Sequence, residues 1–470
     1  MANKPFLKFN KWYGGLADSK YLGIEGSFAA GLGLDIHSKP GLLQAQQALK
    51  KDSGSTVVDL ILAGLTTSNG SSYFFGDAGK IYKRTSGGTW SVLTTITNTP
   101  TILGAAEHSD GYIYFTYSNK VGRLLLSTDG VTESWNTLTN TNTNYGLVFY
   151  HEKQDQIYIG NGNLVAQVDS ASAFTANALD LLSNYEVRDI TLYDIDILVC
   201  ATDPDNTNRS MIFQWDGLAT SWDRSWVYDQ AINWALNYQE NIYLLTGNEG
   251  QLIRFDNGAF TDLKQIPGSY TSSAYFSSKL NSKTIYNKRL HFGLYDGSSG
   301  NPGLNGIYTF GRKNKNYPQI LTTEYPISAN VTTGITIGLV YSNGSTLFVA
   351  WKNGSIYGMD IIDTANKYNG YCELRMINTD RGIKKHFKRF PCSFESLAGT
   401  GISLQFKTDH ASTWTTIATA NISGSTNDNN VFSKRIDAYI LQLRLNLFCS
   451  GNNTPAIEEL TTYIDESSQR

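Results

Sequence analysis

The chain has 470 residues, and its 38 Lys and Arg against 41 Asp and Glu give a net charge of -3. This slight negative charge excludes a general electrostatic grip on nucleic acid, which needs clustered Lys and Arg, and no run approaches the ~18 apolar residues of a membrane span. With 12% aromatic and only 17% charged residues, the composition favours strands and turns, and the length allows a large core.

Residues 1–49 are rich in glycine and other small residues, and they hold too few large apolar side chains for a core of their own. We therefore expect an extended N-terminal arm that lies against the domain after it or against a neighbouring subunit. The positions assigned to assembly through this arm are Trp12, Gly14, Gly15, Asp35, Pro40 and Gly41.

Residues 50–370 repeat one pattern of strands and turns. Two strands joined by a Gly, Asn or Asp turn are followed by another turn and an aromatic residue that opens a further strand, as in YFFGDAGKIYKRTSGGTWSVL. An additional strand precedes several units, for example VVDLILAGL and INWALNYQ. The aromatic residues that close the units are Trp90, Trp135, Phe174, Trp222 and Phe260, with looser copies that end at Tyr317 and Tyr368.

The spacing of these aromatic residues predicts the architecture. Subtraction of residue numbers gives steps of 45, 39, 48 and 38 residues between the first five. A period of ~40–45 residues with four short strands is typical of a β-propeller blade, because one four-stranded sheet cannot bury both faces alone. We predict about seven blades over residues 50–370, with the first strand of each blade lining a central channel.

The segment FDNGAF, residues 255–260, illustrates how one unit is closed. Asp-Asn-Gly favours a tight hairpin turn with positive φ angles. We expect Phe260 to start the fourth strand of its blade and to pack between adjacent blades. The alternative is that such rings form a stacking platform for sugars.

Several carboxylates could carry chemistry. Asp203 and Asp205 in DPDNTN alternate as the first ligands of a calcium loop do, and Thr207 follows them. The segment lacks the Gly and the bidentate Glu of a complete loop, so we expect a hairpin connection, with calcium as the alternative. Asp194 and Asp196 are predicted to share one face of an inner strand, where a glycosidase would need a carboxylate pair. We expect no enzyme activity, no cofactor and no resident metal.

The four cysteines are scattered and form no CxxC pair. This pattern is typical of buried free thiols, with a disulfide among the last three as the alternative. They are Cys200, Cys372, Cys392 and Cys449.

Residues 371–470 contain at least six segments of period-two alternation with polar turns, such as GISLQFKTD, which predict a jelly-roll-like β-sandwich. One segment, RGIKKHFKRF, is strongly basic. We interpret it as a solvated edge strand whose charges prevent pairing between sheets, with contact to DNA or to an acidic neighbour as the alternative. The basic positions assigned to this strand are Lys384, Lys385, Lys388 and Arg389.

The motifs of the arm follow one another in a fixed order directly ahead of the predicted propeller. They are Gly14-Gly15, Phe28, Gly33-Leu34-Asp35-Ile36 and Pro40-Gly41-Leu42-Leu43. This order resembles the opening of tail-associated β-propeller proteins of tailed bacteriophages and is similar to the start of podovirus tail-nozzle proteins. The predicted C-terminal sandwich is similar to the one that follows propellers in phage tail proteins.

The resemblance implies a structural virion protein in the nozzle, baseplate or fibre-attachment region of a tail, assembled in the host cytoplasm. Its partners would be other tail proteins and copies of itself, with at most transient contact to DNA and no membrane span. The alternative is a host-attachment module that binds surface glycans through blade-top loops and exposed Tyr and Trp.

Overall fold

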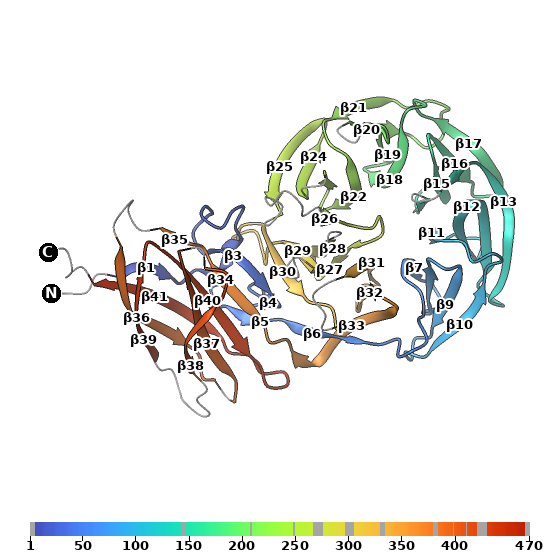
Figure 1. Cartoon of the computed structure of the whole chain (residues 1–470). Helices are drawn as coiled ribbons and strands as arrows, with labels where there is room; N and C mark the ends of the chain where they lie inside the picture. The colour runs from blue at the N-terminus through green and yellow to red at the C-terminus, as the bar shows by residue number, and fades with distance from the viewer. Residues whose placement is uncertain are drawn as a thin grey trace. The chain divides into compact units, whose positions relative to one another are not determined.

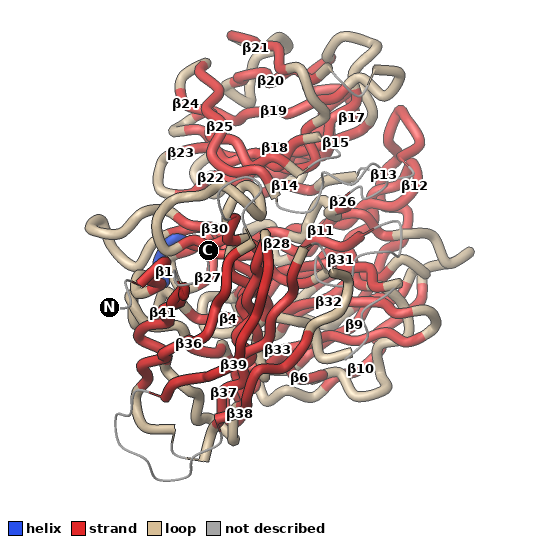
Figure 2. Tube along the Cα trace, turned by 60° about the vertical axis from the view of Figure 1, so that its left-hand side comes forward, coloured by secondary structure: helices blue, strands red, loops and turns tan. Residues whose placement is uncertain are grey.

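The computed structural model describes residues 5–142, 146–206, 209–247, 250–266, 276–296, 305–329, 334–378, 384–397, 399–409, 411–420 and 430–465. Strands dominate these residues, as Figure 2 shows, and the helical element among them is the 3-10 turn η1 (Trp12–Gly14). No helix within these ranges has the length and apolar content needed to cross a membrane.

The chain forms two compact units. Residues 51–305 and 329–361 make up one, and residues 1–50, 306–328 and 362–470 make up the other. We call them the propeller unit and the sandwich unit. The limits expected from the sequence were residues 49 and 370. In this division, residues 1–50 and 306–328 are grouped with residues 362–470 rather than forming separate parts.

Seven antiparallel sheets form the β-propeller (Figure 1). The first three sheets are built from β7 (Ile61–Thr66), β8 (Ser72–Gly76), β9 (Lys80–Arg84) and β10 (Trp90–Thr95); β11 (Ile102–Glu107), β12 (Tyr112–Leu125) and β13 (Gly130–Asn142); and β14 (Val148–His151), β15 (Gln156–Asn161), β16 (Leu164–Val168) and β17 (Phe174–Asp180). The fourth and fifth are built from β18 (Glu186–Tyr193), β19 (Asp196–Thr202), β20 (Ser210–Trp215) and β21 (Arg224–Tyr228), and from β22 (Ile232–Tyr238), β23 (Asn241–Thr246), β24 (Gln251–Asp256) and β25 (Ala259–Gln265).

The last two sheets have less regular connectivity. The sixth follows the order β26-β28-β29-β30 with β27 paired to β28, and the seventh follows β31-β32-β33-β6. Their strands are β26 (Phe276–Ser277), β27 (Lys283–Tyr286), β28 (Arg289–Asp296), β29 (Gly306–Gly311) and β30 (Ile320–Tyr325), then β31 (Ile335–Ser342), β32 (Leu347–Asn353), β33 (Ile356–Lys367) and β6 (Gln47–Lys51).

The first strands of the blades close into a ring. β7, β11, β14, β18, β22, β27 and β31 each contact the next, and β31 contacts β7. The segments predicted as first strands, among them VVDLILAGL and INWALNYQ, are the inner strands of their blades. Between neighbouring blades lie clusters of fully buried aromatic and aliphatic side chains, such as Phe74, Tyr82 and Met359 between the seventh and first blades. Burial of these paired faces drives the stacking of the sheets.

Hydrogen bonds at the ends of the inner strands reinforce the ring, with at least one at each of the seven interfaces. From the first interface to the last they are Ser68 Oγ to Glu107, Ser109 Oγ to Asp155, His151 Nε2 with Ile195 O, Asn237 Nδ2 to Leu192 O, Tyr238 OH to Lys288 O, Ser342 N to Thr284 Oγ1, and Thr66 N to Tyr341 OH. Each blade is therefore linked to both neighbours by polar contacts as well as by apolar packing.

The strand β6, which precedes the first blade in the sequence, supplies the fourth strand of the seventh blade. Just after it, Asp52 N donates to Met359 O (2.8 Å) and Ser53 Oγ accepts from Met359 N (3.1 Å). The Asp52 carboxylate also accepts from Trp90 Nε1 (2.8 Å) and Arg84 Nε (2.6 Å) of the first blade. Asp52 thus joins the last blade to the first.

The turn expected in FDNGAF is confirmed. Asn257 and Gly258 have φ angles of 48° and 90°, and Asp256 pairs with Ala259 across the hairpin. A two-residue hairpin of this kind requires positive φ at both central positions, which Asn and Gly adopt most readily.

The sandwich unit contains two large sheets, with orders β1-β41-β36-β39 and β2-β3-β34-β40-β37-β38, where β35 also pairs with β40. A small sheet of β4 (Leu34–Asp35) and β5 (Gln44–Ala45) lies in the arm. Alternate residues along β40 are fully buried, as the period-two pattern predicts. The strands are β1 (Pro5–Phe9), β2 (Gly15–Leu16), β3 (Ser27–Leu32), β34 (Tyr371–Leu374), β35 (Ile377–Asn378), β36 (Lys385–Phe394), β37 (Gly401–Thr408), β38 (Thr415–Ala420), β39 (Asn430–Ala438), β40 (Ile440–Phe448) and β41 (Ile457–Asp465).

The N-terminal arm is extended and supplies strands to both of these sheets. β1 pairs with β41, and β3 pairs with β34. Trp12 is almost fully buried and its Nε1 donates to Glu458 O at 3.0 Å. The arm therefore obtains its core from the C-terminal residues, which explains how so glycine-rich a segment is ordered.

Two glycines of the arm differ in what a side chain would meet. Both have positive φ, +68° at Gly15 and +98° at Gly41, but a Cβ on Gly15 would lie 2.7 Å from Leu321 O, whereas one on Gly41 would meet nothing within 4 Å. We expect Gly41→Ala to cost about 1–2 kcal/mol from backbone strain alone, and Gly15→Ala to cost clearly more. Thermal unfolding of the two variants checks the difference, and equal losses would contradict it.

Candidate functional site

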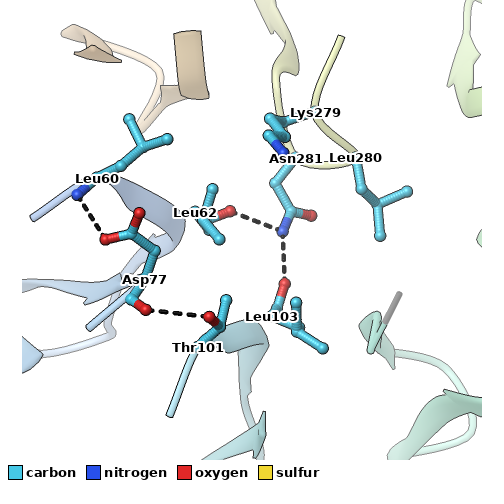
Figure 3. Close-up of a pocket in the computed structure, with 8 residues that line it drawn as sticks. All are labelled: Leu60, Leu62, Asp77, Thr101, Leu103, Lys279, Leu280 and Asn281. Atoms are coloured by element: carbon cyan, nitrogen blue, oxygen red, sulfur yellow. Dashed lines mark hydrogen bonds between the residues drawn. The ribbon is translucent and has the colours of Figure 1, made fainter. Parts of the chain in front are cut away.

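Asn281 crosses the centre of the propeller. It precedes β27 in the sixth blade, and its Nδ2 donates to Leu62 O of the first blade (2.9 Å) and Leu103 O of the second (3.1 Å), as Figure 3 shows. The seventh and first blades separate the sixth from the second, so the side chain spans the middle of the ring. A cavity of about 220 Å³ adjoins it, lined by residues that include Asp77 and Lys279.

A second contact between blades that are not neighbours is the buried ion pair of Asp189 on β18 with Lys283 on β27. The Asp189 carboxylate also accepts from Ile190 N (2.9 Å) and from Ala235 N of β22 (2.6 Å). Burial raises the pKa of Asp189, although Lys283 and the two N–H groups oppose the rise, and burial lowers the pKa of Lys283. One carboxylate thereby links the inner strands of the fourth, fifth and sixth blades.

Replacement of Asn281 by Asp keeps the side-chain shape but removes both donated hydrogen bonds. We expect Asn281→Asp to destabilise the propeller by about 1–3 kcal/mol for each carbonyl left without its partner, measured as a lower unfolding midpoint. The matched control is Asn343→Asp in an exposed turn, where Oδ1 acts only as an acceptor for Ser345 and Thr346. Its midpoint should stay near that of the wild type, and an equal loss in both variants would contradict the assignment.

A groove of about 460 Å³ lies where the inner strands of the first three blades end. Its lining is mostly apolar, and polar residues complete it. The lining residues are Leu65, Thr66, Ser68, Ala105, Ala106, Glu107, His108, Ser109, Gly111, Leu126 and Tyr150. We call this surface the acidic groove.

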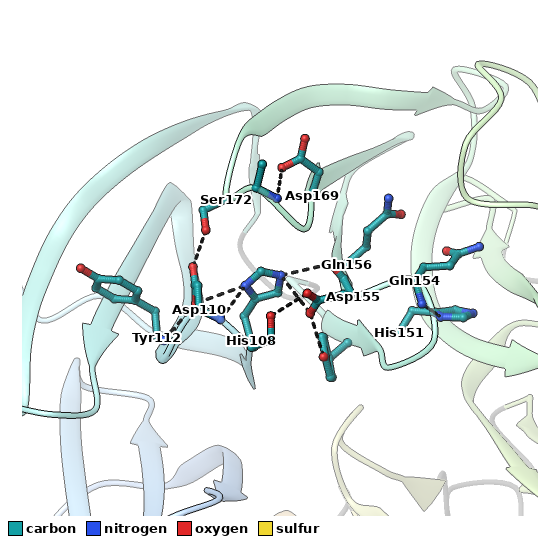
Figure 4. Close-up of polar contacts among 12 residues, drawn as sticks. His108, Asp110, Tyr112, His151, Gln154, Asp155, Gln156, Asp169 and Ser172 are labelled. Atoms are coloured by element: carbon teal, nitrogen blue, oxygen red, sulfur yellow. Dashed lines mark hydrogen bonds and ion pairs between the residues drawn. The ribbon is translucent and has the colours of Figure 1, made fainter.

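Glu107 lines the acidic groove, and Asp110 and Asp155 contact its lining residues His108 and Ser109. Burial, the hydrogen bond to Asp155 and the negative charges of Asp155, Glu152 and Glu107 together raise the pKa of Tyr150 to about 12, with burial as the largest cause. The buried His108 lies between Asp110 and Asp155, with its Nδ1 3.2 Å from the first carboxylate and its Nε2 3.5 Å from the second (Figure 4). The groove therefore combines apolar side chains with nearby negative charge, which favours an apolar partner that carries positive charge.

Five closing aromatic residues pack at blade interfaces. Trp90 lies in the cluster between the seventh and first blades, Trp135 and Phe174 share the cluster between the second and third, and Trp222 and Phe260 lie at the next two interfaces. The rings of Trp135 and Phe174 are 5.8 Å apart. The rings are thus not distributed one to each interface.

The last two closing aromatics lie among residues grouped with the sandwich unit, which also include β29 and β30 of the sixth sheet. Tyr317 precedes β30 and contacts the ring of Tyr13 at 6.0 Å. Tyr368 follows β33, and a Cβ on Gly33 would lie 2.4 Å from its ring. The seventh blade takes its fourth strand from β6, so the aromatic residue at 368 does not open one.

Asp35 and Gly14 organise the backbone of the arm itself, whereas Trp12 and Gly15 pack against residues far along the chain. The Asp35 carboxylate accepts from His37 N (3.1 Å) and Ser38 N (2.9 Å) and fixes the turn that leads to Pro40 and Gly41. A Cβ on Gly14 would lie 2.3 Å from Ser27 N, so the arm packs closely on itself there.

The basic strand is not an edge strand, and that interpretation was wrong. β36 pairs with β39 on one side and β41 on the other. A bulge between Phe387 and Arg389 interrupts the alternation, so Lys388 and Arg389 are both exposed while Phe387 and Phe390 are buried. Lys384 is exposed just before the strand and Lys385 is half-buried. The sequence pattern could not reveal the bulge or the two partners that cover the strand.

The calcium candidate is organised as a turn. One oxygen of Asp203 accepts from the backbone N of Asp205 (3.0 Å) and of Asn206 (3.2 Å), while Thr207 lies outside the described residues. Across the described ranges, no group of three or more His, Cys, Asp and Glu is placed to hold a metal. The four cysteines are free.

Asp194 does not share a strand face with Asp196, contrary to the prediction. Asp194 has a φ of 58° and lies with Ile195 in the turn between β18 and β19, where Tyr193 pairs with Asp196. The central residues Asn281 and Lys283 were missed, because the sixth inner strand, NSKTIY, is too short and polar to be recognised as one. Asp189 lies in β18, and its role was missed because its partner Lys283 is in that segment. The acidic groove could have been suspected from GAAEH, residues 104–108, where small residues that leave space are followed by a carboxylate.

Comparison with known proteins bears on the fold. No protein-family model and no curated protein matches the chain. Among solved structures, the extracellular domain of a hybrid two-component system from B. thetaiotaomicron has a TM-score of 0.51 at 11% identity, over 89% of this chain and 63% of that one.

Two further structures match at lower TM-scores. Virginiamycin B lyase from Staphylococcus aureus gives a TM-score of 0.47 at 14% identity over 67% and 99% of the two chains. YCF48 bound to D1 peptide gives 0.47 at 8% over 67% and 94%. These β-propeller-like proteins differ in function, so the likeness concerns architecture alone. The fold thus defines a seven-bladed β-propeller protein with an extended N-terminal arm and a C-terminal β-sandwich.

Proposed function

We propose that this protein is a structural component of a bacteriophage tail, in its nozzle, baseplate or fibre-attachment region, and that it acts through protein contacts rather than catalysis. The supporting observation is that polar side chains at the centre of the propeller bind other blades. Asn281, Asp189 and Lys283 direct their hydrogen bonds to the inner strands of other blades. Such residues stiffen the ring, and a stiff disk with broad faces suits an assembly component.

The attribution to a tail rests on the order of motifs in residues 14–43 ahead of the propeller. The extended arm adds support, because its strands pair with C-terminal strands and fix the motifs in place. Its partners in this proposal are other tail proteins and copies of itself, with assembly in the host cytoplasm and final location in the virion.

Host attachment through surface glycans is the alternative function. A sugar platform needs an open aromatic face. In the sandwich unit, Trp414 has Arg444 at 4.3 Å and Lys407 at 4.6 Å from its ring centroid, so cations already contact this ring. This contact disfavours glycan binding at that ring.

The test is to locate the chain in intact particles. Mass spectrometry and antibody labelling of purified virions should detect it at a fixed copy number on the tail, and a nonsense mutation in its gene should yield particles with incomplete tails. Its absence from particles would exclude the proposal. Retention of purified protein on cell-envelope saccharide would favour the alternative.

A further inference from the structure

A loop of the arm exposes three large apolar side chains within four residues. The exposed fractions are 40% for Tyr21, 74% for Leu22 and 50% for Ile24. Lys20 precedes them, with its Nζ 5.4 Å from the centroid of the Tyr21 ring. We call residues 20–24 the apolar loop. Concentration of exposed apolar residues of this kind marks a site of protein contact.

Hydrogen bonds hold the apolar loop in one conformation. Ser19 Oγ accepts from Leu22 N (2.9 Å), and Ile24 O accepts from Ser27 Oγ (2.6 Å). Residues near β34 and β35 hold its backbone from the other side, since Met376 N donates to Lys20 O (2.8 Å) and Arg375 Nη1 donates to Gly23 O (3.0 Å). The loop is therefore ordered before it meets a partner, which lowers the entropy lost on binding.

The acidic groove has the complementary properties. Its floor includes Leu65, Ala105 and Leu126, which suit apolar side chains. Glu107 lines the groove and accepts from Ser68 of the first blade, so the position of its carboxylate is fixed. The loop offers apolar side chains beside the ammonium group of Lys20, and the groove offers an apolar floor beside carboxylates. The two surfaces match in both polarity and charge.

We propose that the apolar loop of one copy binds in the acidic groove of a second copy of this chain, with Lys20 of one facing Glu107 of the other. This inference rests on the proposed function and specifies how the protein assembles with itself. The two surfaces differ, so the contact is heterologous, and repeated application of it builds a ring or a filament rather than a closed twofold dimer.

The primary test is the sedimentation velocity of the full chain over a range of concentrations. The wild type should form oligomers that weaken as salt is raised, because the charged contacts are screened. Leu22→Asp should weaken association on the order of 30-fold or more, as loss of a central apolar contact does. The matched control is Leu218→Asp in the propeller unit, a leucine 70% exposed that belongs to neither surface, and it should assemble like the wild type.

Charge exchange tests the pairing. Lys20→Glu and Glu107→Lys should each weaken association, and the two changes in one chain should restore it, because the opposite charges are then exchanged between copies. Thermal unfolding of each variant separates loss of assembly from loss of folding. Failure of the double variant to recover association, with all variants folded, would overturn the proposal.

Mixing two defective variants tests the direction of the contact. Leu22→Asp keeps an intact groove and Glu107→Lys keeps an intact loop, so the mixture should form one-to-one heterodimers and nothing larger. Oligomers of Leu22→Asp that match the wild type would overturn the proposal. A wild-type chain that stays monomeric, whose incorporation into particles nevertheless depends on Leu22, would overturn it too and assign the loop to another tail protein. That outcome would leave the tail location itself intact.

Discussion

Replacement of Asp189 by Ala is expected to destabilise the propeller by about 3–5 kcal/mol, because it leaves the ammonium group of Lys283 buried without its counter-ion. The backbone N of Ala235 loses its acceptor at the same time. Hydrogen exchange measured by mass spectrometry should show faster exchange in β18, β22 and β27, the three inner strands that the carboxylate links, together with a lower unfolding midpoint.

The double variant Asp189→Ala with Lys283→Met distinguishes an uncompensated charge from a general packing defect. Removal of both charges should recover much of the lost stability, since a buried ion pair adds little over well-packed apolar groups. Asp262→Ala on the exposed face of β25 is the control and should leave the midpoint unchanged. A double variant less stable than Asp189→Ala alone would contradict this account.

Replacement of Trp12 by Ala is expected to cost about 3–5 kcal/mol in the sandwich unit, the range for truncation of a buried aromatic residue. The indole is 1% exposed, stacks on Phe9 with centroids 6.4 Å apart and donates to Glu458 O. Release of the N-terminal strand should follow, because β1 pairs with β41 next to this residue. Limited proteolysis should then cleave within residues 5–26 much faster than in the wild type.

Trp12→Phe provides the graded comparison. It keeps most of the ring but loses the donated hydrogen bond, so the expected cost falls to about 1–3 kcal/mol for the unsatisfied Glu458 carbonyl and the smaller ring. Equal proteolysis of Trp12→Ala and the wild type would show that the strand is retained without the indole.

The propeller could be predicted because its signal is repeated. Each hairpin turn, such as Asn257-Gly258, is specified by local backbone preferences, and the closing aromatic residues recur at a blade-like period. The exact packing of those rings could not be predicted. Whether Trp135 and Phe174 meet at one interface depends on the long strands β12 and β13, whose bulges are invisible in a pattern of apolar residues.

The central residues were harder to predict than the blades. Asn281 and Lys283 lie in a short polar segment whose partners are 94 to 219 residues away along the chain. Hydrophobic periodicity and secondary-structure propensity depend on residues close together in the sequence. These contacts form only when the ring of blades closes. The same reason applies to β36, where partner strands from residues 430–465 convert an expected edge into an interior position.

The origin of β6 affects how the chain must fold. The strand precedes the first blade but completes the seventh, and Asp52 and Ser53 pair with Met359 at the far end of the propeller sequence. During synthesis, β6 therefore cannot pair with β33 until Met359 has left the ribosome. Such long-range pairing is slow to form. A fragment that begins after Ser53 would expose the free edge of β33, and unpaired edges of this kind invite strand exchange between molecules.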